Sequence, residues 1–145
     1  MTRTEIAKLA SPYLKEEKRH DVWEIADIVI EDKTLIAHIR MRSHYTSPSD
    51  KSGFHLTILS TLEFLSQLML IFVQVWGGYT EKTKEGWMLE SSISCKRAIR
   101  DPENIEVCMN LASIKKVKGS IIAVTKSKVS DKNGRFEATL KALLH

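Results

Sequence analysis

The chain has 145 residues, of which 43% are hydrophobic and 28% are charged, as in an ordinary globular protein. Three prolines and six glycines argue against a disordered or fibrous chain. The net charge is +4, and because basic and acidic side chains are mixed almost everywhere we expect no nucleic-acid partner. The length fits one domain over residues 1–145.

Helical and strand periodicity predict the main elements in chain order. A short amphipathic helix over residues 3–11 is stopped by Pro12. Two strands, 21–31 and 34–43, form a tight hairpin, and the turn-rich loop 46–53 follows. A long apolar helix then runs from Leu56 to Trp76 and ends at Gly77-Gly78. The remaining strands are 86–99, 104–117, 120–130 and 135–143.

The long helix is also long enough to span a bilayer. Glu63 lies near its middle, and a carboxylate there costs about 2.5–3.5 kcal/mol in lipid, so we expect a helix inside a soluble fold and no membrane span. The first ten residues lack the apolar core of a signal peptide. Cys95 and Cys108 suggest neither a disulfide framework nor a metal site. We therefore expect a reduced, cytoplasmic protein without metal or cofactor, with both thiols packed in the core.

One side of the long helix is apolar and must be shielded from water by other parts of the fold. A curved antiparallel sheet wrapped around one central helix provides it, so the sequence predicts an α+β chain with the hotdog fold and a short N-terminal helix. We expect a homodimer or a dimer of dimers, because one sheet leaves part of the helix uncovered and has a free edge strand. The predicted apolar side consists of Ile58, Leu62, Leu65, Met69, Phe72, Val73 and Trp76.

The opposite side of the helix carries a polar stripe made of Thr57, Ser60, Glu63, Gln67 and Gln74. A carboxylate buried among Leu, Phe and Met has a raised pKa, which suits general acid or base chemistry. The alternative is a stripe that faces solvent or a dimer partner, with Glu63 solvated or ion-paired.

The loop before the helix is the second candidate region. Tyr45 ends the second predicted strand, and His55 lies near the helix start, where free N–H groups can polarise a carbonyl oxygen. His55 could equally be a capping or packing residue. The lysines at 115, 116, 118, 126 and 128 could meet phosphates, although a solvated face is the usual role of such a run.

The helix segment from Leu62 to Leu68 resembles the E-x-x-x-Q helix of the 3-hydroxyacyl-carrier-protein dehydratases, and Glu63 matches their catalytic acid. Those enzymes also use a His in a GHFPG loop. The equivalent position here, near Ser49-Asp50, holds neither that His nor the Pro-Gly pair.

More of the chain, about residues 10–115, resembles the FcoT-like type III fatty acyl-CoA thioesterases, a hotdog branch. The resemblance rests on Pro12-Tyr13, Tyr45, the segment from His55 to Leu68, and a looser run from Ser91 to Pro102. It implies that Tyr13 and Tyr45 are catalytic tyrosines. The asparagines of the family fall on Thr57 and Ser66, and Glu63 falls on an apolar position of the family. Small relatives also occur as virulence-associated, flagellum-coregulated proteins.

The resemblance implies a protein that binds acyl-CoA or acyl-carrier-protein thioesters beside the helix at a subunit interface and hydrolyses them. Glu63 would activate water, held by Gln67 and Ser60, while backbone N–H groups near 55–57 polarise the carbonyl. A dehydratase or hydratase that uses Glu63, and a non-catalytic acyl-binding or interaction module, are the alternatives. The candidate residues are Glu63, Tyr45 and Tyr13 for catalysis, and His55, Thr57, Ser60, Ser66 and Gln67 for substrate binding.

Overall fold

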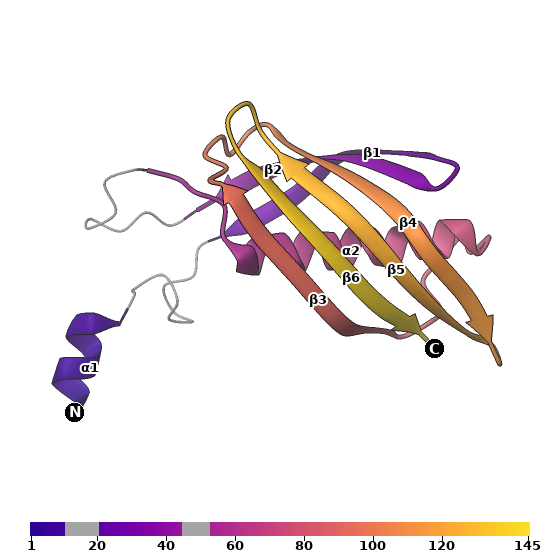
Figure 1. The fold of residues 1–145 in the computed structure, drawn as a ribbon, viewed down its shortest axis with the longest axis horizontal. Helices are drawn as coiled ribbons and strands as arrows, with labels where there is room; N and C mark the ends of the chain where they lie inside the picture. The colour runs from indigo at the N-terminus through magenta and orange to yellow at the C-terminus, as the bar shows by residue number, and fades with distance from the viewer. Residues whose placement is uncertain (11–20, 45–52) are drawn as a thin grey trace.

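The computed structural model describes residues 1–10, 21–44 and 53–145 (Figure 1). All the predicted helices and strands are found, each with boundaries within two residues of those expected. They are α1 (Arg3–Leu9), β1 (Val22–Glu31), β2 (Thr34–Ser43), α2 (Ile58–Trp76), β3 (Gly86–Arg97), β4 (Ile105–Val117), β5 (Ser120–Ser130) and β6 (Arg135–Leu144).

The six strands form one antiparallel sheet in the order β1-β2-β4-β5-β6-β3, and the sheet curves along one side of α2 (Figure 1). Consecutive strands pair directly in the β1–β2, β4–β5 and β5–β6 hairpins. β3 instead crosses to the far side of the sheet and pairs with β6. This arrangement confirms the predicted hotdog fold and leaves β1 and β3 as edge strands.

Two of the hairpin turns contain residues in the left-handed region. Asp32 has φ 54° between β1 and β2, and Lys118 and Gly119 have φ 47° and 82° between β4 and β5. Two-residue turns with positive φ match the twist of the strands they join. The turns therefore fix the strand register that the alternating sequence predicts.

The core lies between α2 and the concave face of the sheet. Alternate residues of β4 such as Ile105, Val107 and Met109 are fully buried, as the strand pattern predicts. The fully buried side chains of α2 are Thr61, Phe64, Leu65, Leu68, Met69, Phe72 and Val73.

The predicted apolar side of α2 is wrong at its two ends. Ile58 and Trp76 are 46% and 40% exposed, and Leu62 is only partly buried. Thr61, Phe64 and Leu68 are buried in their place. A helical wheel shows which residues share a side, but it does not show how far the covering sheet extends. α2 is long and apolar enough to span a membrane by composition, yet one side of it packs in this core.

The prediction that both cysteines pack in the core is also wrong. Cys95 is exposed on the edge strand β3, and Cys108 is partly buried. Cys108 is registered with Ile36 and Lys128, whose side chains lie on the face of the sheet away from α2. Alternation on a strand does not show which strand lies at an edge.

Candidate functional site

The first turn of α2 provides the backbone donors of the candidate site. Thr57 is the N-cap, and its Oγ1 accepts a hydrogen bond from the Ser60 N–H at 3.1 Å. The amides of Ile58 and Leu59 belong to the first turn, whose N–H groups have no acceptor inside the helix. Together with the positive end of the helix dipole, they can stabilise a negatively charged oxygen.

The segment that leads into α2 is anchored on both sides. The Leu56 N–H donates to the Ile99 carbonyl at 2.8 Å, and the buried ring of Phe54 lies 4.7 Å from the ring of His44. His55, between these two anchors in the sequence, is partly buried. The Leu56 N–H is engaged by Ile99 and is therefore not available to a ligand.

Glu63 lies on the outward side of α2 and is exposed. The predicted burial among Leu, Phe and Met is therefore wrong, because α2 turns those side chains toward the sheet. The Oε2 atom of Glu63 accepts a hydrogen bond from Nε1 of Trp23, on β1, at 3.4 Å. The Trp23 ring meets Phe64 edge-on, with centroids 6.1 Å apart and an interplanar angle of 75°. The indole thus holds the carboxylate against the helix.

Ser60 contacts a different carboxylate from the one expected. It is buried, and its Oγ donates to Oδ2 of Asp21 at 3.4 Å. Asp21 directly precedes β1, two residues before Trp23. The start of β1 therefore contributes a carboxylate and an indole, each joined to one residue in the first two turns of α2.

The remaining polar side chains of the helix differ in exposure. Gln67 is exposed one turn after Glu63. The Ser66 Oγ donates to the Leu62 carbonyl at 2.6 Å, and Gln74 Nε2 donates to the Leu70 carbonyl at 2.9 Å. Glu63 and Gln67 thus face away from the sheet, toward solvent or a partner, which is the alternative that the sequence left open, whereas Ser60 and the Gln74 side-chain oxygen are buried.

The structure brings Thr57, Ser60, Glu63 and Gln67 together along one side of α2. Tyr13 and Tyr45 lie outside the described residues. Sequence reasoning missed Asp21 and Trp23. The alternation of the strand could have placed Trp23 on the helix-facing side of β1, but its contact with Glu63 depends on how far β1 curves around the helix.

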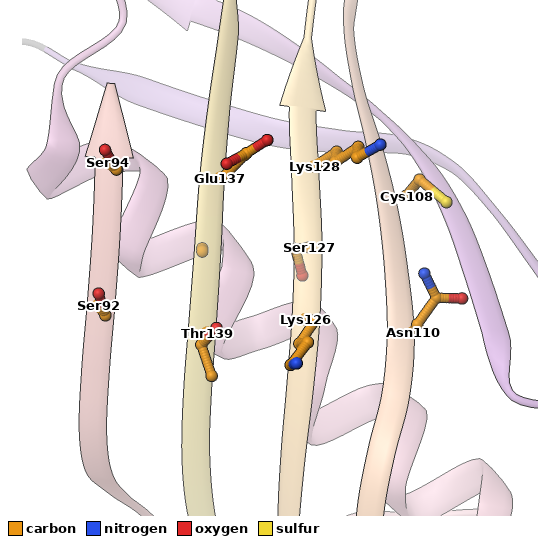
Figure 2. Close-up of a pocket in the computed structure, with 10 residues that line it drawn as sticks. Ser92, Ser94, Cys108, Asn110, Lys126, Ser127, Lys128, Glu137 and Thr139 are labelled. Atoms are coloured by element: carbon orange, nitrogen blue, oxygen red, sulfur yellow. The ribbon is translucent and has the colours of Figure 1, made fainter. Parts of the chain in front are cut away.

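A separate polar hollow of about 470 Å³ lies on the opposite face of the sheet (Figure 2). Figure 2 shows its side chains projecting from β3, β6, β5 and β4, with α2 behind the sheet. It shares no residue with the helix site. Among the described residues, no group of three or more His, Cys, Asp or Glu side chains is placed to hold a metal ion.

No protein-family model and no curated protein sequence matches the chain. Several solved structures match it in fold. A mutant of the thioesterase PA1618 from Pseudomonas aeruginosa superposes with a TM-score of 0.60 at 13% identity, over 86% of this chain and 80% of that one. The putative thioesterase yhdA from Lactococcus lactis gives 0.61 at 12% identity, over 83% and 93%.

A hypothetical thioesterase from Streptococcus pneumoniae, solved with coenzyme A, gives a TM-score of 0.54 at 14% identity, over 85% of this chain and 88% of that one. The dehydratase heterocomplex ApeI:P from Xenorhabdus doucetiae gives 0.60 at 11% identity, over 83% and 82%. Likeness at such low identity shows the fold alone. The chain therefore shares the hotdog fold of proteins described as thioesterases and as a dehydratase.

Proposed function

We propose that the chain, as a single domain over residues 1–145, forms a cytoplasmic homodimer that binds acyl-CoA or acyl-carrier-protein thioesters beside α2 and hydrolyses them. The observation that carries the proposal is the Trp23–Glu63 contact, which holds a carboxylate on the uncovered side of α2, close to the positive end of the helix. Thioesterases with this fold, one of them solved with coenzyme A, support the choice of substrate.

The dimer in this proposal forms through β3. This edge strand is exposed along most of its length, and residues 91–95 (SSISC) carry no charged side chain. An unprotected edge strand can pair with a second copy and extend the sheet across a two-fold axis. The acyl chain then lies beside α2 at the subunit interface, where the second copy limits the access of water.

In the proposed mechanism Glu63 takes a proton from a water molecule, and the resulting hydroxide attacks the thioester carbonyl carbon. The N–H groups of Ile58 and Leu59 stabilise the oxyanion of the tetrahedral intermediate. The carbon–sulfur bond then breaks, and the proton passes from Glu63 to the leaving thiolate. The substrate-binding candidates surround the bound acyl thioester in this proposal. They are His55, Thr57, Ser60, Ser66 and Gln67.

Tyr13 and Tyr45 orient the thioester in this proposal, as the resemblance to the FcoT-like thioesterases implies. Thr57 and Ser66 replace the asparagines of that branch, so Glu63 takes the role of activating water. For the biological role we propose virulence-associated expression together with the flagellum, which rests on the same resemblance.

Replacement of Glu63 by Gln tests the mechanism, because Gln keeps the shape of the side chain and cannot accept the proton. Thiol release from acyl-CoA substrates of several chain lengths should fall by about 100-fold or more, with an unchanged circular dichroism spectrum. Glu137→Gln, on the opposite face of the sheet, is the matched control and should keep full activity. Unchanged turnover by Glu63→Gln would refute the catalytic role.

A hydratase is the second candidate, because partly buried His55 lies near the start of the helix that carries Glu63. A His and a Glu are the acid–base pair of the dehydratases that this helix resembles. Water addition to an enoyl thioester removes its ultraviolet absorbance, so an unchanged absorbance rules this candidate out. Tight binding of an acyl ligand without turnover of any thioester would instead identify a non-catalytic module.

A further inference from the structure

The C-terminal end of α2 and the tip of the β4–β5 hairpin expose apolar and basic side chains together. Val75 and Trp76 on α2 are 51% and 40% exposed, and Val117 at the hairpin tip is 48% exposed. Lys115, Lys116 and Lys118 flank Val117 and are all exposed. We call these six residues the basic corner.

A direct contact joins the two parts of the corner. The Lys116 Nζ lies over the Trp76 ring, 5.4 Å from its centroid, within the range of a cation–π interaction. The hairpin turns at Lys118 and Gly119, both with positive φ, which keeps the lysines at the tip of the two strands. Lys116 is registered with buried Ile121 and projects on the α2 side, whereas Lys115 and Val117 project from the other face of the hairpin, so the basic and apolar groups surround an exposed tip.

The charge of the corner is uniform at its centre. Residues 113–120 (SIKKVKGS) contain three lysines and no acidic residue. Lys84 adds a fourth lysine, because its Nζ donates to the Gly119 carbonyl at 2.6 Å. Glu81 and Glu85 flank Lys82 and Lys84 in the segment before β3, so acidic side chains accompany this fourth lysine.

We propose that the basic corner binds an anionic lipid surface. Exposed Trp and aliphatic side chains next to lysines are the combination that enters the headgroup region of anionic bilayers. The corner is a hairpin tip beside a helix end and offers far fewer than the roughly 20–30 residues that each side of a stable protein–protein interface supplies. Charge complementarity and this small contact area favour lipid over an acidic protein.

The corner is independent of the proposed dimer and catalytic site. Its residues lie on α2, on β4 and in the β4–β5 turn, and none lies on β3. Glu63 is more than three turns earlier on the helix than Trp76. Lipid binding can therefore be tested without assuming thioester hydrolysis.

Co-sedimentation with phosphatidylcholine vesicles, with and without phosphatidylglycerol, tests the proposal. The protein should bind only the vesicles that contain phosphatidylglycerol, and added salt should weaken binding. Lys116→Glu with Lys118→Glu should reduce binding by roughly tenfold or more. The matched control is Lys126→Glu with Lys128→Glu on the outer face of β5, which should bind like the unmodified chain.

Trp76 also provides a direct optical readout. In a Trp23→Phe, Trp87→Phe background its fluorescence should shift to shorter wavelength with phosphatidylglycerol vesicles and stay unchanged with phosphatidylcholine alone. An absence of vesicle binding, or equal loss in the control pair, overturns the proposal. Corner-dependent binding of polyglutamate or of nucleic acid without vesicle binding would also overturn it, in favour of that partner.

Discussion

The carboxylate of Glu63 owes its position to a residue 40 places earlier in the chain. A Glu on an exposed helix face usually samples several rotamers, and fixing it has an entropic cost. Trp23 reduces this freedom because its ring packs on Phe64 and its N–H points at the carboxylate. Trp23 is therefore a positioning residue, and Glu63 the group that would act on substrate.

Replacing Trp23 by Phe separates the packing of the ring on Phe64 from the hydrogen bond of the N–H to Glu63. Phe keeps an aromatic ring for Phe64 and removes the N–H donor, so we expect kcat for thioester hydrolysis to fall by about tenfold with a smaller change in KM. The melting temperature should fall only slightly, because the lost hydrogen bond is to an exposed carboxylate and Phe keeps most of the ring that packs against the core. Trp76→Phe is the control and should keep wild-type kcat. Equal kcat in the two variants would show that the indole N–H has no positioning role.

At the scale of the elements, Asp131 joins two connections that are distant in the sequence. Its Oδ2 accepts from the Arg100 and Asp101 N–H groups at 2.9 and 3.0 Å, and its Oδ1 accepts from the Asn133 and Gly134 N–H groups. One carboxylate thereby fixes the β5–β6 turn to the connection between β3 and β4. Burial raises the pKa of Asp131, but the four backbone hydrogen bonds outweigh it and lower the pKa below its ordinary value.

This lowered pKa predicts how stability depends on pH. The unfolded chain takes up the proton first, near the ordinary Asp value of about 3.9. The contribution of Asp131 is therefore fully present above that pH and is lost as the pH falls toward the folded-state pKa.

Asp131→Asn should lower the free energy of unfolding by about 1–3 kcal/mol near pH 7, because charge-assisted bonds become neutral ones and one oxygen acceptor is lost. The difference from wild type should shrink near pH 3, as measured by urea unfolding at fixed protein concentration. Asp27→Asn, an exposed change on β1, should alter stability by less than about 0.5 kcal/mol. A difference that stays constant with pH would contradict the assignment.

Local sequence patterns were sufficient to predict the helices and strands, because the periodicity of each element depends only on residues that are neighbours in the chain. Alternation places Ile105, Val107 and Met109 on the buried side of β4 wherever that strand lies in the sheet. The exposure of Cys95 depends on strand order, and that of Trp76 on where the sheet ends. The polar stripe identified Glu63 and Ser60, but their partners Trp23 and Asp21 come from a segment 40 and 39 residues earlier.

At the scale of the whole molecule, the two edges of the sheet differ in how well they are protected. β1 carries a bulge between Ile25 and Asp27, and its Glu24 pairs with Arg40 and Arg42 of β2 at 3.4 and 2.9 Å. Bulges and charges oppose pairing with another chain. β3 has register shifts only near its two ends, and its uncharged centre is regular. Of the two edges, β3 is therefore the one suited to pair with a second copy.

Lysines on β3 should prevent this pairing. Ser92→Lys with Ser94→Lys places two charges on an exposed edge without changing the buried core, so the chain should stay folded and sediment as a monomer. Thr139→Lys is the control, on the same face of the sheet but one strand in from the edge, and should remain dimeric. Thioester turnover should fall with loss of the dimer, since the proposed acyl site lies at the subunit interface. A wild-type chain that is monomeric at all concentrations, or a lysine variant that still pairs, would exclude β3 as the interface.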